Sequence, residues 1–143
     1  ADSCFAKFPA VHYKAGTLKA IAYDRSKRRV AEHTLVTTAA TPSQLVFCNL
    51  KGDKIDYIEV AACDKRGNRI PSYCGTATIA ASGCHIAGID NGNQHDPQGK
   101  KYTSASQGNF FEGRLRLYID KTTPGTVSVS IPGVKPLVIT LRR

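Results

Sequence analysis

No stretch of this sequence approaches the roughly 18 consecutive apolar residues that a transmembrane helix requires, so we predict no membrane span. The first four residues, Ala1–Cys4, are polar and lack the apolar segment of a secretory signal peptide, which a mature or processed chain would have lost. Apolar residues nevertheless make up 41% of the chain, which indicates a globular protein and not a disordered one. Its 143 residues suffice for one good core, or for one domain and part of another.

Acidic residues are scarce, since 11 Asp and Glu stand against 20 Lys and Arg, giving a formal net charge of +9. Such an excess favours acidic partners, namely nucleic acid, anionic glycans or an anionic membrane surface. The small basic clusters, however, fall at expected turns or termini: Lys27–Arg29, Lys65-Arg66, Lys100-Lys101 and Arg142-Arg143. Because no aromatic-and-basic strand motif accompanies them, we interpret them as solvated turns and expect no nucleic-acid interface.

A Cys-x-x-Cys pair is also absent, which argues against a zinc ribbon or a redox dithiol. The five cysteines are Cys4, Cys48, Cys63, Cys74 and Cys84. Two interpretations stay open: buried free thiols, or one or two disulfides formed in an oxidising compartment. For the second, Cys63–Cys74 is the local candidate pair, and we favour a secreted or periplasmic location, although the sequence does not determine the compartment.

Catalytic signatures are missing too. No nucleophile-elbow sequence surrounds Ser104 or Ser106. The adjacent pair His95-Asp96 offers two metal-ligand types but is not by itself a metal site, and the other histidines are scattered. We therefore predict no catalytic residue, no metal and no cofactor in this chain.

What the sequence does contain is a repeated strand pattern. Between Asp56 and Asp64, the apolar Ile58 and Val60 alternate with Tyr57 and Glu59, the period of a half-buried strand. Similar segments recur about every ten to twelve residues with turn signals between them, at Gln44–Cys48, Thr76–Ala80, Cys84–Ile89, Arg114–Asp120, Thr126–Ile131 and Leu137–Leu141. No stretch holds a helical period, so we predict an all-β sandwich over residues 43–143.

The N-terminal part, residues 1–42, contains a predicted hairpin at 17–38. Leu18, Ala20 and Ala22 alternate along its first strand, and a charged turn precedes the returning strand. Two strands do not bury a core alone, so the hairpin needs a partner that completes its sheet. Small and polar residues around Pro42 mark the boundary with the sandwich.

A long polar loop is expected at 91–109, which is too long for a plain connector. Its entrance is rich in amide and carboxylate side chains, which supply the candidate site residues: Asp90, Asn91, Asn93, His95 and Asp96. Asn91-Gly92 is typical of a tight turn. The alternatives are a turn that packs against a neighbouring domain and a loop that hydrogen-bonds sugar hydroxyls.

Taken in order, several motifs resemble the last two immunoglobulin-like domains of family 2 glycoside hydrolases, the β-galactosidase group. The segment Tyr13–Tyr23, followed by Thr37 and Pro42, is similar to the end of the penultimate domain. The last domain is matched by Tyr57–Val60, Asp64-x-x-Gly67-Asn68-Arg69-x-Pro71, Gly83, Gly88–Asn93, Phe111-x-Gly113-Arg114-Leu115 and Pro124-Gly125.

The resemblance implies an immunoglobulin-like β-sandwich at 43–143, preceded by the C-terminal part of another such domain at 1–42. The catalytic carboxylates of the family lie in a (β/α)₈ barrel, which would precede this chain. Glycoside hydrolysis needs two carboxylates about 5 to 10 Å apart across one cleft, and we expect no such pair from Glu59 and Glu112, the central glutamates. The implied function is a non-catalytic C-terminal module for domain packing or assembly, with weak carbohydrate contact.

Two other functions remain alternatives. One is an independent adhesin or lectin-like module that binds a glycan through the 91–109 loop. The other is a structural or assembly protein in which a partner chain completes the 1–42 sheet by strand addition. The predicted partners are accordingly the remainder of a parent enzyme or another chain, and a glycan.

Overall fold

The computed structural model describes residues 7–8, 12, 16–96, 106–120 and 124–142. All regular elements in these ranges are β-strands, and the same ranges contain no helix that could cross a membrane. Contacts divide the chain into two compact units, Ala1–Thr38 and Ala39–Arg143. The boundary expected at residue 42 falls in the segment between the last strand of the first unit and the first strand of the second. Each unit is described by itself.

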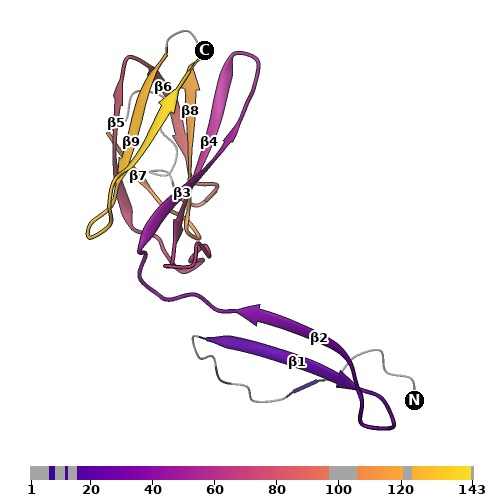
Figure 1. The fold of residues 1–143 in the computed structure, drawn as a ribbon. Coiled ribbons are helices and arrows are strands. Elements are labelled where there is room, and N and C mark those ends of the chain that lie inside the picture. The colour runs from indigo at the N-terminus through magenta and orange to yellow at the C-terminus, as the bar shows by residue number, and fades with distance from the viewer. Residues whose placement is uncertain (1–6, 9–11, 13–15, 97–105, 121–123, 143) are drawn as a thin grey trace. The chain divides into compact units, whose positions relative to one another are not determined.

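The first unit is the hairpin of strands β1 (Thr17–Tyr23) and β2 (Arg29–Val36), drawn in indigo and purple in Figure 1. The antiparallel register runs from Thr17 opposite Val36 to Ala22 opposite Ala31, with an irregularity beside Tyr23. At the turn, the backbone N–H of Arg28 donates to the Asp24 carboxylate over 2.9 Å, which fixes the reversal that the charged turn predicts.

The faces of this hairpin differ in composition, because residues directly opposite each other project from the same side. One face is apolar apart from one histidine: Leu18, Ala20, Ala22, Ala31, His33 and Leu35. The other carries the ion pair of Lys19 with Glu32 at 2.9 Å. Every residue of both strands is exposed, so the apolar face has no second layer within the described residues.

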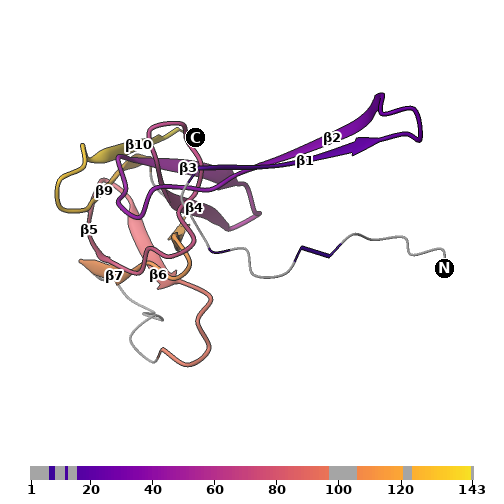
Figure 2. The ribbon, with the colours of Figure 1, turned by 90° about the horizontal axis from the view of Figure 1, so that it is seen from below.

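The second unit is a sandwich of two four-stranded antiparallel sheets (Figures 1 and 2). One sheet has the order β3 (Gln44–Leu50), β4 (Ile55–Cys63), β8 (Arg114–Asp120), β6 (His85–Asp90). The other has the order β10 (Leu137–Leu141), β9 (Gly125–Ser130), β5 (Thr76–Ser82), β7 (Gln107–Asn109). This confirms the predicted all-β, immunoglobulin-like sandwich.

The core lies between the sheets and follows the predicted alternation. In β4, Ile58 and Val60 are fully buried, while Tyr57 and Glu59 project outward. The other sheet contributes Val127 and Val129 from β9, also fully buried. Burial of such side chains, worth about 1.5–3 kcal/mol each relative to exposure, is the main source of stability.

Two of the sequence motifs meet at one end of the sandwich. The carboxylate of Asp64 accepts hydrogen bonds from the backbone N–H groups of Arg66 (2.9 Å) and Asn68 (3.0 Å), which closes the turn at Gly67. Gly113 bonds this region to β8: its N–H donates to the Tyr73 carbonyl over 2.8 Å, and its carbonyl accepts from Ala62. Both motifs therefore have a structural role.

Strand β7 was not predicted, because the whole of 91–109 was expected to be loop. It pairs with β5, with Gly108 opposite Ala77. A Cβ on Gly108 would come within 3.0 Å of side-chain carbons of both Ile89 and Leu115, so only glycine fits there comfortably. Residues 97–105 of the expected loop lie outside the described residues.

Candidate functional site

The outer face of the sheet β3-β4-β8-β6 carries a row of charged side chains. Leu115 and Leu117 point into the core. Arg114 and Arg116 alternate with them along β8 and therefore project outward. The register places Arg116 opposite Glu59 of β4 on one side and opposite Asp90 of β6 on the other. The side chains of Glu59, Arg116 and Asp90 therefore form a row of alternating charge across β4, β8 and β6.

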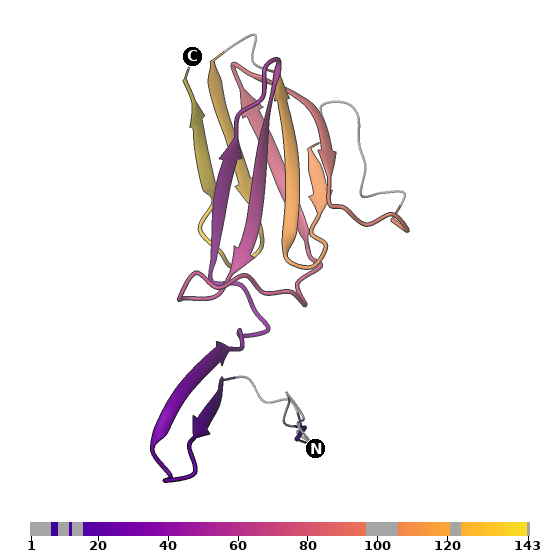
Figure 3. The ribbon, with the colours of Figure 1, turned by 90° about the vertical axis from the view of Figure 1, so that its right-hand side faces the viewer.

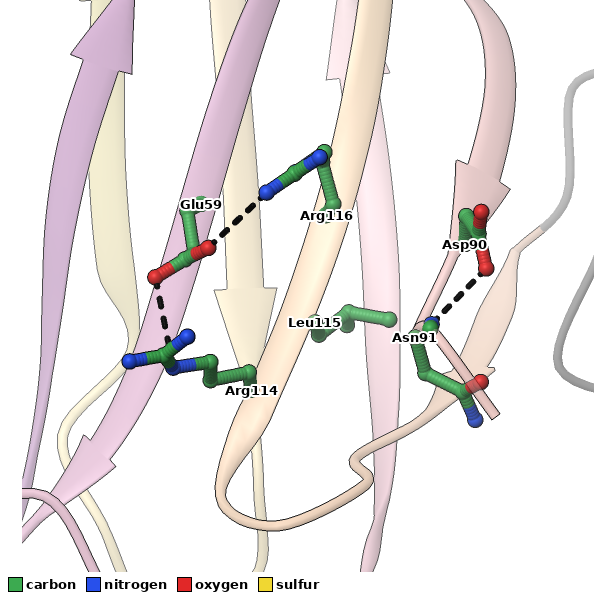
Figure 4. Close-up of a pocket in the computed structure, with 7 residues that line it drawn as sticks. Glu59, Asp90, Asn91, Arg114, Leu115 and Arg116 are labelled. Carbon is green, nitrogen blue, oxygen red and sulfur yellow. Dashed lines mark hydrogen bonds and ion pairs between the residues drawn. The ribbon is translucent and has the colours of Figure 1, made fainter. Parts of the chain in front are cut away.

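Glu59 is held by two arginines, as Figure 4 shows. Its Oε2 lies 3.2 Å from Nη2 of Arg116, and its Oε1 lies 3.5 Å from Nε of Arg114. The hydrogen bond to Glu59 is the main reason why the pKa of Arg116 is raised above its usual value, with a further contribution from Tyr118. Arg116 therefore stays charged at physiological pH.

A pocket of about 160 Å³ opens beside this row. It is lined by Glu59, Asp90, Asn91, Gly92, Arg114, Leu115 and Arg116. Next to it, the rings of Tyr57 and Tyr118 meet edge to face with centroids 5.4 Å apart. Guanidinium donors and carboxylate acceptors around one hollow can hydrogen-bond a polar ligand, including one that carries hydroxyl groups.

The loop after β6 is held by its own side chains. Asp90 accepts from the N–H of Gly92 over 2.8 Å, and Asn91 accepts from the N–H of Asn93 over 2.9 Å. Asn93 in turn accepts from the N–H of His95 over 3.0 Å. The side-chain amide of Asn91, which is buried, donates to Asp96 and to the carbonyl of Asn109. These contacts are the tight turn that the sequence predicts.

The structure brings only part of the predicted loop to the pocket. Asp90 and Asn91 line it, whereas Asn93, His95 and Asp96 are not among the lining residues. Sequence analysis placed no site on the two arginines. The signal was present in the alternation Arg114-Leu115-Arg116, which puts both guanidinium groups on the outer face once Leu115 is assigned to the core.

Within the described residues, the two central glutamates do not share a pocket. Glu112 lies in the turn before β8 with a φ of 49° and is not part of the pocket that contains Glu59. Within the described ranges, no group of three or more His, Cys, Asp or Glu side chains is placed to hold a metal ion.

The predicted Cys63–Cys74 disulfide is not formed in the structure, where Cys63 is a buried free thiol and Cys74 an exposed one. Burial raises the pKa of the Cys63 thiol, helped by the neighbouring charge of Asp64. Disulfide formation between Cys63 and Cys74 stays a prediction, and a count of free thiols on the denatured protein tests it. Five free thiols would exclude any disulfide, and three would indicate one disulfide.

No protein-family model matches this sequence, and neither does any curated protein. Solved structures do match it. A glycosyl hydrolase family 2 member from Bacteroides cellulosilyticus is 19% identical with a TM-score of 0.72, over 92% of this chain and 18% of that one. A beta-glycosidase from Bacteroides vulgatus is 22% identical with a TM-score of 0.65, over 92% and 18%. A beta-glucuronidase from glycoside hydrolase family 2 is 22% identical with a TM-score of 0.68, over 92% and 14%.

These likenesses show the fold. The chain spans less than a fifth of the length of each of these proteins. Residues 39–143 make up less than three quarters of this chain, so a match over 92% also includes residues of the hairpin unit. The hairpin and the sandwich thus both have counterparts in the matched structures.

Proposed function

We propose that this chain is a non-catalytic module at the C-terminal end of a longer family 2 glycoside hydrolase, where it serves domain packing and assembly. The observation that carries the proposal is the likeness of both units to parts of larger glycosidases, over 92% of this chain but only 14–18% of theirs. The matching order of sequence motifs is a second support.

The hairpin unit supports this reading on physical grounds. Its apolar face is exposed, with Leu18 opposite Leu35 and both more than half exposed. An isolated two-stranded hairpin is marginally stable in water. Strands supplied by preceding residues of a longer polypeptide would give this face the second layer that it lacks among the described residues.

The size of the natural polypeptide tests the proposal. Antibodies raised against this chain are expected to detect, on a denaturing gel of source cells, a polypeptide several times larger than 15.4 kDa. A natural polypeptide of 15.4 kDa would contradict it. The isolated chain is also expected to leave aryl glycosides unhydrolysed, and turnover that is lost in Glu59→Gln would overturn the non-catalytic assignment.

Hydrogen exchange tests the role of the hairpin separately. In the isolated chain, the amides of β1 and β2 are expected to exchange within seconds to minutes, while those of β4 and β8 stay protected. In the longer polypeptide, the hairpin amides are expected to become as slow as those of the sandwich. Equally fast exchange in both would show that no preceding strands cover the hairpin.

A second candidate function is glycan binding, favoured by the pocket that Asp90 lines together with Arg114 and Arg116. Calorimetric titration with neutral and anionic oligosaccharides is the test. We expect Asp90→Ala and Arg116→Ala to abolish any specific binding, while Asn93→Ala, just outside the pocket lining, leaves it intact. Binding that is lost only in Asn93→Ala would place the glycan on the loop instead, and no binding at all would remove this candidate.

A further inference from the structure

The outer face of the sheet β3-β4-β8-β6 carries a tyrosine pair, Tyr57 of β4 and Tyr118 of β8, which lie opposite each other in the register. Their rings meet edge to face at an interplanar angle of 80°. Tyr57 is 37% exposed and is not part of the core, because its neighbour Ile58 is the side chain that points inward. Strands β4 and β8 lie side by side, as Figure 3 shows, so the two rings form one patch on this face.

The ring of Tyr57 is positioned by two neighbours. It meets the ring of Tyr118 with centroids 5.4 Å apart. A Cβ on Gly52, in the turn between β3 and β4, would lie 3.0 Å from Cε2 of Tyr57, so the glycine leaves room for the edge of this ring. An aromatic ring that is already held in place loses little conformational entropy when a ligand packs on it, which suits it to binding.

The tyrosine pair lies on the same face of the sheet as the polar pocket. Arg116, which lines the pocket, comes two residues before Tyr118 in β8, and Arg114 comes four residues before it. At about 3.3 Å per residue, Tyr118 lies about 7 Å beyond Arg116 and about 13 Å beyond Arg114. Arg116 interacts with both Glu59 and Tyr118. One continuous surface therefore runs along β8 from the pocket to the tyrosine pair.

The two parts of this surface offer the two kinds of contact that a sugar makes. Sugar hydroxyl groups donate to carboxylates and accept from guanidinium groups, and the pocket lining contains both. Oδ1 of Asp90 accepts from the N–H of Gly92 over 2.8 Å, so Oδ2 is the oxygen that can accept from a ligand. The C–H groups on one face of a sugar ring are apolar and pack against aromatic rings such as those of the tyrosine pair.

Resting on the glycan-binding candidate above, we propose that this surface binds a neutral, linear oligosaccharide, with one sugar ring in the pocket and a later ring stacked on the tyrosine pair. A single sugar ring beside Arg114 does not span the distance of about 13 Å to Tyr118, whereas a linked second or third ring reaches it. Affinity therefore depends on the length of the oligosaccharide, and Tyr57 is a binding residue outside the pocket.

The charges of the pocket favour a neutral ligand over an acidic one. Glu59 and Asp90 offset Arg114 and Arg116, so the charged side chains of the lining cancel. Both guanidinium groups are already paired with Glu59, at 3.5 and 3.2 Å. The net charge of +9 attracts acidic glycans over long range, but salt screens this attraction beyond about 8 Å at physiological ionic strength. A sugar carboxylate in the pocket would meet the carboxylates of Glu59 and Asp90 at close range.

Calorimetric titration with linear oligomers of glucose, galactose, mannose and xylose, from one to four residues long, tests the proposal. In at least one series, we expect affinity to rise about tenfold from the monosaccharide to the trisaccharide. Tyr57→Ala is expected to lower the trisaccharide affinity to that of the monosaccharide. Tyr57→Phe is expected to keep the gain, because the contact uses the aromatic ring and not the hydroxyl group.

The matched control is Tyr23→Ala, the same substitution at a hairpin tyrosine that is 60% exposed. It is expected to leave affinity unchanged at every length, and far-UV circular dichroism confirms folding of each variant. Equal affinity at all lengths, or a gain that survives Tyr57→Ala, overturns the proposal but leaves glycan binding in the pocket in place. Tighter binding of the matching uronic-acid oligomers overturns the choice of a neutral ligand. Binding of no oligomer overturns both the proposal and the glycan-binding candidate.

Saturation-transfer NMR gives an independent readout of stacking. Irradiation of aromatic ring protons of the protein is expected to reduce the C–H signals of one sugar ring of the bound trisaccharide more than those of the others. This transfer is expected to be lost in Tyr57→Ala and kept in Tyr23→Ala. Transfer of unchanged strength in Tyr57→Ala would contradict stacking on the tyrosine pair.

Discussion

Strand β1 of the hairpin and strand β8 of the sandwich carry similar apolar alternation but differ in what lies behind the apolar side. In β8, Leu115 and Leu117 are fully buried against the second sheet, whereas Leu18 of β1 is 56% exposed. Alternation therefore fixes which side of a strand is apolar, while burial depends on a second layer. Among the residues that the structure describes, the hairpin has an apolar face without a second layer.

The largest expected difference between the two units is in the free energy of unfolding that is lost when one leucine in each is truncated to alanine. Leu117→Ala removes fully buried side-chain volume and is expected to lower the free energy of unfolding by about 2–5 kcal/mol. Leu18→Ala in the same chain is expected to change it by less than about 0.5 kcal/mol. Urea unfolding followed by circular dichroism measures both. Equal losses would mean that the hairpin packs against the sandwich in solution.

A smaller effect comes from the glycines of the two units. Gly113 has a φ of +72°, and a Cβ there would lie 2.3 Å from the carbonyl oxygen of Ile70. Gly113→Ala is expected to cost about 1–3 kcal/mol in the sandwich, because the clash adds to the strained backbone. Gly16→Ala in the hairpin meets nothing within 4 Å and is expected to leave the thermal transition of the sandwich in place.

We expect the sandwich to lose stability at acid pH because of Asp64. Burial alone would raise the pKa of Asp64, but hydrogen bonds from the backbone N–H groups of Asn68 and Arg66 outweigh it and lower that pKa. Ionised Asp64 therefore stabilises the fold above its ordinary pKa of 3.8, and this contribution is lost as the pH falls through the lower, folded-state value.

The comparison of wild type with Asp64→Asn measures this contribution. The difference in unfolding free energy is expected to be largest above pH ~5 and to shrink below pH ~3. Asp24→Asn, in the hairpin turn, is the matched control and is expected to leave the acid transition of the sandwich unchanged. A wild-type advantage that is the same at all pH values would show that the Asp64 charge is not responsible.

The smallest effect concerns the ion pairs of the two units. Glu59→Gln breaks the contacts with Arg114 and Arg116 and is expected to cost up to about 1 kcal/mol at low salt, and less in 1 M salt. Glu32→Gln in the hairpin, where Lys19 and Arg29 are its partners, is expected to leave sandwich unfolding unaffected. A larger loss for Glu32→Gln would show that the hairpin contributes to global stability.

Much of the sandwich was predictable because its strands alternate strongly and its turns carry glycine, asparagine or proline. Strand β7 was not, since Gln107–Asn109 is short, polar and held by pairing with β5. The pocket was half predictable: Asp90 and Asn91 were chosen as an amide-rich turn, but their meeting with Arg116 depends on the order of β6 and β8 in the sheet. Strand order is a long-range property that local pattern does not encode.

By itself, the sequence determined the fold class, the hairpin turn and the motif turns, because each depends on residues close together in the chain, as Asp64 and Asn68 are. Only the tertiary structure decided what shares a surface. It placed Glu59 between two arginines 55 or more residues away and left β3 at an open edge. Those outcomes follow from sheet order and register, which are fixed when distant strands bury their common core.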